Sequence, residues 1–350
     1  MKKVFLKIAV VGVLVLLINA ALYSLVYKRL LPYYWGSYEI SDKREYLVAN
    51  KNTYNSLFIG SSKTHNQINP VLFDQLANEA GLNVKSYNFG IGGLTPLESL
   101  HVYENLLLHD SLTFKYAFIE LDWLGTIRYE NLNVPRSFYW LDSKNYLTSV
   151  SSLVQSSVPL ERRAWGLFHY SLDYTENMLN VGKVQEYLKF RQHRQEQSIG
   201  PNDSNVVYQG FIPMKVKMRQ TEQDLYEEVV TSAQMSVKNF KSLSTNKMSE
   251  PFLRRMQNII SISEQRGITP FFVVPLQWKY YQYRELVPII NALGRERVLC
   301  LFDIDKYKHV YQYDYFADPN HLNAKGAEKY TQQLFQNFKT QCDEANMAKK

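Results

Sequence analysis

Cysteine is scarce in this chain of 350 residues, which contains only Cys300 and Cys342. The two are not spaced like metal ligands. They could pair in an oxidising compartment, or both could be buried thiols. The sequence also lacks a cluster of His, Cys and carboxylate ligands for zinc and a glycine-rich phosphate-binding loop. We therefore expect no metal and no cofactor.

Long basic blocks are absent as well. The formal net charge of +7 is spread along the chain, and lysine and arginine gather only briefly, in "LERRAW" and "YLKFRQHRQ". This distribution disfavours a nucleic-acid partner. The sequence shows no internal repeat and no low-complexity tract, which disfavours a solenoid or a disordered tail. An apolar share of 45% is typical of a globular protein with a sizeable core.

One long apolar segment lies at the N-terminus. Residues 8–26 are almost entirely apolar, and about 20 such residues cross a bilayer as a helix. Lys2, Lys3 and Lys7 precede the segment, which favours an N-terminus on the cytoplasmic side. A cleaved signal peptide and a buried core helix are the alternatives, but the run is long for a signal peptide and has no clear cleavage site. We predict a single-pass anchor in the cytoplasmic membrane over residues 1–36, with residues 37–350 outside the cytoplasm.

Short apolar runs alternate with amphipathic ones after the anchor. Residues 55–60, 84–90 and 116–123 read as buried strands, and residues 70–81 and 95–110 as the helices between them. The alternation stops near residue 124 and resumes near residue 250. From there it predicts helices at 251–267, 283–294 and 323–338 and strands at 268–276 and 297–304. The pattern indicates an α/β domain with a parallel sheet covered by helices, interrupted by an insertion at about 124–250.

Four polar features fall where predicted strands end, which is where ligands bind in an open parallel sheet. They are Gly60-Ser61-Ser62, "NFGIGG" at 88–93, Asp122, and "DPNHLN" at 318–323. A serine becomes a nucleophile when a histidine accepts its proton and a carboxylate orients that histidine. Asp318 and His321 stand three residues apart, so one turn opening the last helix could hold both. Taken alone, the same residues would suit a plain turn and a surface histidine.

Together these motifs resemble the SGNH hydrolase superfamily, also called GDSL-type esterases and acyltransferases. The resemblance covers residues 55–122 and 251–338. "IGSSKTHNQINP" is similar to the membrane-anchored envelope branch, which includes the teichoic-acid D-alanyl transfer protein and the alginate-acetylation proteins. The resemblance implies a three-layer, flavodoxin-like αβα fold. It also implies a triad of Ser62, His321 and Asp318.

The resemblance further implies an oxyanion hole, in which the backbone N–H groups of Ser62 and Gly93 would stabilise the negative oxygen. The family adds an asparagine after the third strand, where this chain has Asp122. An ionised Asp122 would repel the oxyanion, and Asn88 is a substitute donor to consider.

We expect a membrane-anchored serine esterase or O-acyltransferase that acts on acyl esters of a cell-envelope glycan or polymer. The resemblance also suggests a membrane-bound O-acyltransferase as a partner. The alternative is a non-catalytic partner of such an acyltransferase, or a polymer-binding protein, which keeps the fold. The acyl group, the acceptor and the choice between hydrolysis and transfer stay open, because each uses the same residues.

Overall fold

The computed structural model describes most of the chain outside the predicted insertion. The described residues are 2–22, 37–108, 112–122, 132–156, 159–179, 185–189, 209–215, 227, 250–276, 283–301, 303 and 306–347. They form two compact units. The first contains residues 1–42, 126–154 and 158–200, and the second contains residues 43–125, 155–157 and 201–350.

The second unit is built on a five-stranded parallel sheet, which confirms the predicted mixed α/β fold. The strands stand in the order β2-β1-β3-β4-β5, so the first strand in the chain is not at an edge. All five predicted strands are present. Their bounds are β1 Ser56–Gly60, β2 Ser86–Gly90, β3 Tyr116–Glu120, β4 Thr269–Val274 and β5 Val298–Cys300.

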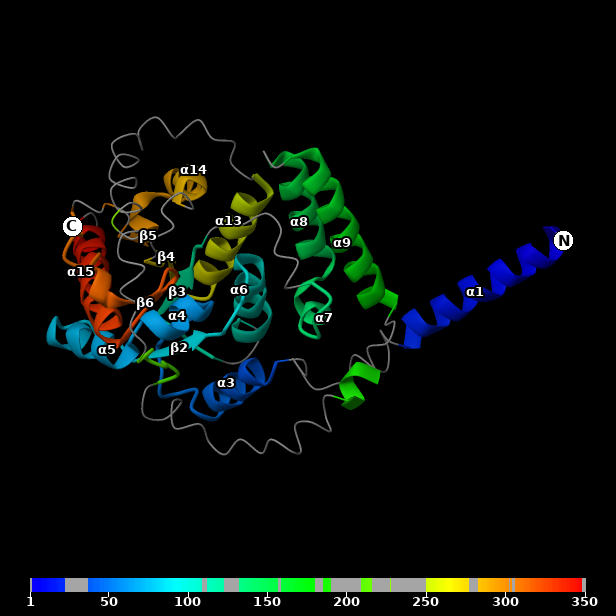
Figure 1. Cartoon of the computed structure of the whole chain (residues 1–350). Coiled ribbons are helices and arrows are strands. Elements are labelled where there is room, and N and C mark those ends of the chain that lie inside the picture. The colour runs from blue at the N-terminus through cyan, green and yellow to red at the C-terminus, as the bar shows by residue number, and fades with distance from the viewer. Residues whose placement is uncertain are drawn as a thin grey trace. The chain divides into compact units, whose positions relative to one another are not determined.

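Helices cover the sheet on both sides, as Figure 1 shows. On one side are α5 (Pro70–Glu79) and α15 (Ala324–Met347), and on the other are α6 (Pro96–Val102) and α13 (Glu250–Gln265). The remaining elements of this unit in the described residues are the α4 helix Ser62–Gln67, the π-helical η2 Tyr103–Leu107, α14 Tyr283–Leu293, the 3-10 turns η7 Arg295–Arg297 and η8 Tyr313–Tyr315, and the short strands β6 Phe316–Asp318 and β7 His321–Leu322. The predicted helix at 95–110 is therefore α6 followed by a π-helical turn.

A row of phenylalanines forms the core on the α5 and α15 side. Phe58, Phe118 and Phe271 are in register on β1, β3 and β4, and their rings stack at centroid distances of 4.5 and 5.7 Å. Phe73 of α5 and Phe338 of α15 meet this row edge-on. Alternate strand residues point to the same face of a sheet, so this single row fixes which side of the sheet both helices cover.

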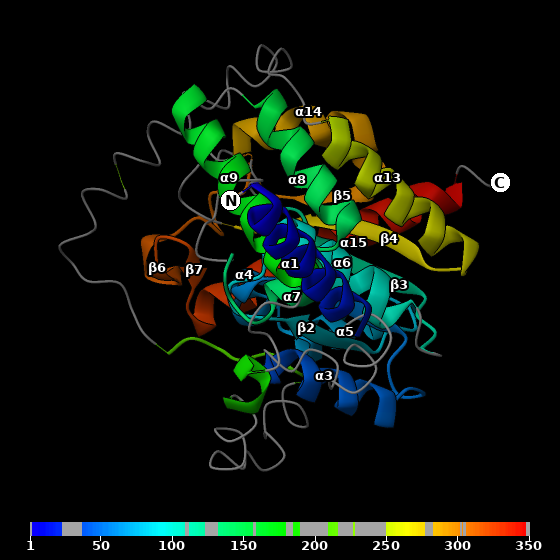
Figure 2. The same cartoon turned by 90° about the vertical axis from the view of Figure 1, so that its right-hand side faces the viewer.

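The first unit contains α1 (Lys2–Leu22), α7 (Ser137–Trp140), α8 (Ser143–Gln155) and α9 (Leu160–Leu179). Figure 1 and Figure 2 show α8 and α9 side by side, and the Tyr146 and Tyr174 rings stack between them at 4.3 Å. In the described residues, α1 is the one helix long and apolar enough to cross a membrane. The boundary between the two units falls inside helix α3 (Tyr38–Ala49), between residues 42 and 43.

Several predictions lie wholly or mainly outside the described residues. The positions after the apolar segment, residues 23–36, are among them, as is most of the predicted insertion beyond α9. The insertion boundaries at 124 and 250 therefore stay a prediction.

Candidate active site

The first strand delivers two serines to the carboxyl edge of the sheet. β1 ends at Gly60, Ser61 caps the following helix, and Ser62 is the first residue of α4. Gly60 has no room for a side chain, because a Cβ there would collide with the Thr64 hydroxyl and the Glu120 side chain. The close approach of Thr64 and Glu120 therefore favours glycine at the end of β1.

Ser62 lies within hydrogen-bond distance of the predicted base. Its Oγ is 2.8 Å from His321 Nε2, and His321 Nδ1 is 2.8 Å from Asp318 Oδ2. His321 is only partly buried, with 21% of its side chain exposed. The three side chains that were singled out in sequence thus form one continuous hydrogen-bonded chain that solvent can reach.

Asp318 and His321 face each other across a tight antiparallel hairpin of β6 and β7. The sequence pattern placed them in a turn opening the last helix. Instead α15 begins only at Ala324, where Asn323 Oδ1 accepts the backbone N–H of Gly326. Cross-strand pairing sets the distance between carboxylate and ring, which D-x-x-H spacing alone does not specify.

The Asp318 carboxylate is held in its ionised form. Partial burial acts to raise its pKa, but hydrogen bonds from the His321 ring and from the backbone N–H groups of Asn320 and His321 outweigh this, so the pKa lies below its ordinary value. An ionised Asp318 favours the tautomer of His321 that carries its proton on Nδ1. Nε2 is then free to accept the Ser62 proton.

Gln67 ties the hairpin to the helix that carries Ser62. This fully buried side chain donates from Nε2 to the Asn320 carbonyl at 2.9 Å. Thr331 of α15 joins the same region by accepting the Asn69 backbone N–H at 3.0 Å. Ser62 and His321 are therefore linked by direct contacts between their supporting elements.

Ser61 has a different task from Ser62. Its Oγ donates to Glu120 Oε1 at 2.6 Å, and its backbone N–H donates to Glu120 Oε2 at 2.9 Å. Thr64 adds two further donors, N–H and Oγ1, to the same carboxylate oxygen. Burial and the nearby charge of Asp122 raise the Glu120 pKa, while Lys63 and the hydroxyl donors oppose this. Through these hydrogen bonds Glu120 holds the turn between β1 and α4 in place.

Lys63, next to Ser62 in the chain, forms a buried ion pair with Asp122. Lys63 Nζ is 2.6 Å from Asp122 Oδ2, and each side chain is only 7% exposed. Asp122 is thus engaged as the counter-ion of a lysine and does not offer a hydrogen-bond donor to an oxyanion. Sequence reasoning missed both Lys63 and Glu120, although two carboxylates two positions apart at the end of a buried strand were a readable signal.

Asn88 also has a role that the sequence did not indicate. Its amide donates to the carbonyls of Thr64 and Ile68, both at 2.8 Å, and its Oδ1 accepts the Gly90 N–H. Both amide hydrogens are therefore used to fasten α4 to β2, and this arrangement disfavours Asn88 as an oxyanion donor. Gly93 adopts a φ of 72°, a left-handed conformation that suits glycine, and its role in the oxyanion hole stays a prediction.

These contacts define the site by geometry alone. No model of a known protein family and no curated protein matches this chain. The function proposed below therefore rests on the residues that the structure brings together.

A short segment, residues 209–215, borders the same end of the sheet. The Gln209 carbonyl accepts the Asn88 N–H at 2.8 Å, and the Met214 carbonyl accepts the Ala324 N–H at 2.9 Å, directly after the hairpin. Lys43, a buried lysine of α3, donates to the Gly90 and Gly210 carbonyls at 2.7 and 3.0 Å. The segment is thus fastened to β2 and to the start of α15.

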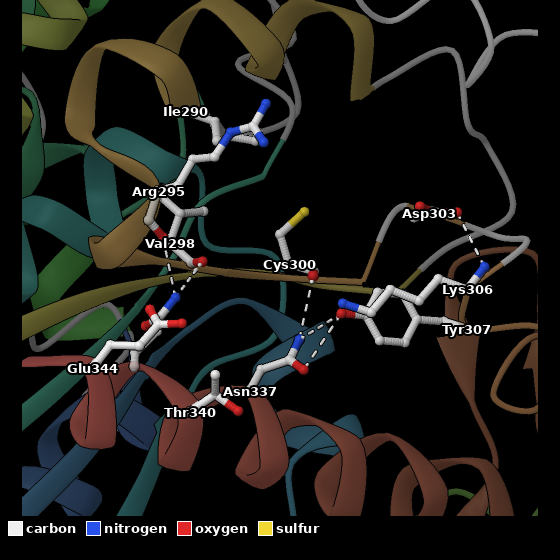
Figure 3. Close-up of a pocket in the computed structure, with 11 residues that line it drawn as sticks. Ile290, Arg295, Val298, Cys300, Asp303, Lys306, Tyr307, Asn337, Thr340 and Glu344 are labelled. Atoms are coloured by element: carbon white, nitrogen blue, oxygen red, sulfur yellow. Dashed lines mark hydrogen bonds between the residues drawn. The ribbon is translucent and has the colours of Figure 1, made fainter.

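A pocket of about 420 Å³ lies away from the triad. It opens beside β5, between α14 and α15, and Figure 3 shows the Cys300 thiol, Asn337 and Tyr307 along its wall. Neither Ser62 nor His321 lines it. Cys300 and Cys342 are both half-buried and form no disulfide, so the structure holds them as thiols. Among the described residues, no group of three or more His, Cys, Asp or Glu side chains is placed to bind a metal ion.

Proposed function

We propose that this chain is a membrane-anchored serine esterase or O-acyltransferase of the SGNH type. The observation that carries the proposal is the continuous chain from Ser62 Oγ through His321 to Asp318, with links of 2.8 Å. Hydrogen-bond distances between nucleophile, base and orienting carboxylate are the geometric signature of acyl transfer through serine. The five-stranded parallel sheet with the nucleophile at its carboxyl edge supports the same fold family.

The reaction would proceed through an acyl-enzyme. Ser62 Oγ attacks the acyl carbonyl while its proton passes to His321 Nε2, and the Asp318 carboxylate stabilises the resulting imidazolium. The C–O bond of the ester then breaks, and His321 returns the proton to the departing alcohol. Water or a second hydroxyl, deprotonated by His321, then attacks the acyl carbonyl. The bond between the acyl carbon and Ser62 Oγ breaks, and His321 returns the proton to Ser62 Oγ. The backbone N–H groups of Ser62 and Gly93 would stabilise the oxyanion at each step.

The acyl esters of a cell-envelope glycan or polymer are the proposed substrates. An apolar N-terminal helix with no buried residue would hold the domain at a membrane. Lys2, Lys3 and Lys7 favour the N-terminus inside, which would place the domain on the outer face of the cytoplasmic membrane. A domain tethered there would meet envelope polymers, and a membrane-bound O-acyltransferase could supply its acyl groups.

Covalent trapping with a fluorophosphonate probe tests the proposal. The intact protein should be labelled on Ser62, and Ser62→Ala should abolish labelling. Ser61→Ala is the matched control: it should keep labelling but lower the free energy of unfolding by about 1–3 kcal/mol, because Glu120 loses a buried donor. Absence of labelling on any serine of the folded protein would contradict the proposal.

A second candidate function is a non-catalytic partner that keeps this fold and binds an acyltransferase or a polymer. The observation that favours it is Asp122, an ion-paired carboxylate near the position where the family has an oxyanion-binding asparagine. The same probe separates the two functions, because a non-catalytic chain would not react even with its triad geometry intact.

A further inference from the structure

The first unit exposes an unusual share of apolar side chains. In the described residues outside α1, twelve large hydrophobic side chains are exposed, and most belong to this unit. Those of the first unit are Leu147, Val154, Leu160, Trp165, Phe168, Leu172, Met178 and Leu188. Single exposed hydrophobic residues are normal on a protein surface, but a contiguous group marks a surface that contacts something else.

Three of these side chains form a stripe along α9. Trp165, Phe168 and Leu172 are 56%, 54% and 39% exposed, and they stand at spacings of three and four residues. The Trp165 and Phe168 rings stack at 5.9 Å. Residues three and four apart lie on one face of a helix, so the three form a continuous apolar surface.

The opposite face of α9 is the one that packs within the unit. Gly166, Tyr170, Asp173 and Asn177 are buried there. Asp173 accepts the Asn133 N–H and the Ser137 hydroxyl, which holds this face against the residues before α7 and the start of α7. The face formed by Trp165, Phe168 and Leu172 is thus the exposed side of a helix whose other side packs within the unit.

The end of α9 meets the helix that is apolar enough to cross a membrane. The Asn19 side chain, in the last turn of α1, donates to the Leu179 carbonyl at the end of α9. Figure 1 shows the C-terminal end of α1 next to this end of α9. A helix the length of α1 spans roughly 30 Å, about the thickness of the hydrocarbon core. Its last turn, and with it the end of α9, would then lie near the level of the lipid headgroups.

We propose that the face of α9 formed by Trp165, Phe168 and Leu172 lies in the interfacial region of the bilayer that α1 crosses. Its occupant is the lipid itself, at the boundary between headgroups and acyl chains, where an amphipathic helix buries its apolar face. Tryptophan favours this depth because its ring is apolar and its N–H is polar. The inference rests on α1 crossing a bilayer and is independent of any acyl chemistry.

Site-specific fluorescence quenching in phosphatidylcholine vesicles tests the inference on the full chain. Cys300 and Cys342 are replaced by serine, and one environment-sensitive label is attached at Phe168→Cys, at Leu14→Cys in α1, or at Val71→Cys on the exposed side of α5. Lipids brominated at shallow acyl positions should quench the label at 168, and iodide in the water should not. The label at 71 should show the reverse. Lipids brominated near the chain ends should quench the label at 14.

A second variant changes two further exposed residues of this face, which should leave the free energy of unfolding nearly unchanged. Adding Trp165→Gln and Leu172→Gln should remove much of the lipid quenching at position 168 while leaving the circular dichroism spectrum unchanged. Iodide quenching at 168 equal to that at 71 would overturn the proposal. Protection of 168 from both quenchers, which indicates a protein partner or a second copy, would overturn it too, as would an unquenched label at 14.

Discussion

The carboxylate of Asp318 accepts hydrogen bonds from two backbone N–H groups and from the ring that it orients. The Asn320 N–H contributes a bond of 2.7 Å and the His321 N–H one of 3.1 Å, both to Oδ1. These donors fix the carboxylate within the hairpin itself. The orientation of His321 therefore depends on a side chain that is positioned by its own hairpin.

Asp318→Asn should keep the fold of the hairpin but lower kcat by roughly 10³–10⁴-fold, because an amide favours the wrong tautomer of His321. Steady-state hydrolysis of a chromogenic acetyl ester, compared with Ser62→Ala as the inactive reference, measures the loss. A decrease of only a few-fold would show that Asp318 does not orient the base.

The lowered pKa of Asp318 also gives a pH dependence with a definite sign. A carboxylate whose pKa is lower in the folded state contributes stability above its unfolded pKa, and that stability is lost as the pH falls through the folded value. Between pH 7 and pH 5 the contribution should be constant. Denaturant unfolding from pH 5 to pH 2 should therefore show a smaller loss of stability in Asp318→Asn than in the parent protein.

Lys63→Met should be strongly destabilising, because it leaves Asp122 buried beside Glu120 without its counter-ion. Removing one member of a buried ion pair costs about 3–5 kcal/mol. Lys85→Met is the matched control, since Lys85 is a half-exposed partner of Asp74 at 3.7 Å and should cost less than about 1 kcal/mol. Urea unfolding measures the free energy of unfolding of both variants. Equal losses would show that the Lys63–Asp122 pair contributes no more than an exposed ion pair.

Helix α4 is the element on which the candidate site depends most. Ser62 stands at its beginning and Gln67 at its end, where it holds the hairpin of His321. Asn88 of β2 fixes the same helix through two of its carbonyls. A helix of six residues has little stability of its own, so these contacts keep it in place.

Gln67→Leu should lower kcat by roughly 10- to 100-fold with a small effect on KM, because misplacing a catalytic group by about 1 Å has an effect of this size. Gln75→Leu, on the exposed side of α5, should leave both constants unchanged. The same ester assay measures them, and an unaffected kcat in Gln67→Leu would show that the hairpin is positioned without Gln67.

Helix α5 makes a second pH-dependent contact with the sheet. Asp74 accepts the Ser86 N–H and hydroxyl at the start of β2, and burial raises its pKa to about 6. The folded protein then binds a proton that the unfolded chain releases near pH 4, so this contribution to stability falls as the pH rises from 4 to 6. The loss should be about 3 kcal/mol, since each pKa unit corresponds to about 1.4 kcal/mol.

Asp74→Asn should flatten the stability curve between pH 4 and pH 7, and Glu79→Gln on the same helix should not. Chemical denaturation at closely spaced pH values gives the curves. A slope in Asp74→Asn equal to that of the parent protein would assign the pH dependence to other groups.

The strands were predictable because each is a short apolar run with a turn at its end, as in "SLFIG" before Ser61. The proximity of Ser62, Asp318 and His321 was predictable because the motifs that contain them together resemble one family pattern. Their catalytic role stays a prediction. The partners of Glu120, Lys63 and Lys43 were not, because each joins residues far apart in sequence: 59 positions separate Ser61 from Glu120. Local patterns do not encode such pairs. The same holds for the hairpin of Asp318 and His321, whose strands are too short to show a period.

At the scale of the whole molecule, the N-terminal helix is an element long and apolar enough to anchor the protein in a membrane. None of α1 is buried within the protein, and a signal peptide would show the same apolar pattern. A membrane anchor stays in the mature chain, whereas a signal peptide is removed from it. We predict that protein extracted from membranes keeps its first residues, so its intact mass should equal that of the full sequence. A mass lacking the first 20 or more residues, with the protein in the soluble fraction, would identify a cleaved signal peptide.

The proposed nucleophile and its base are separated by 259 positions in the chain. At roughly 5–20 residues per second, ribosomes need tens of seconds to make that stretch. Ser62 therefore leaves the ribosome long before His321 exists, and the hairpin gains its contacts with α15 only when that helix has also been made. A protein exported during its synthesis would complete its triad only after nearly all of the chain has passed the membrane. Acyl esters in the cytoplasm would then be protected from it by the order of assembly.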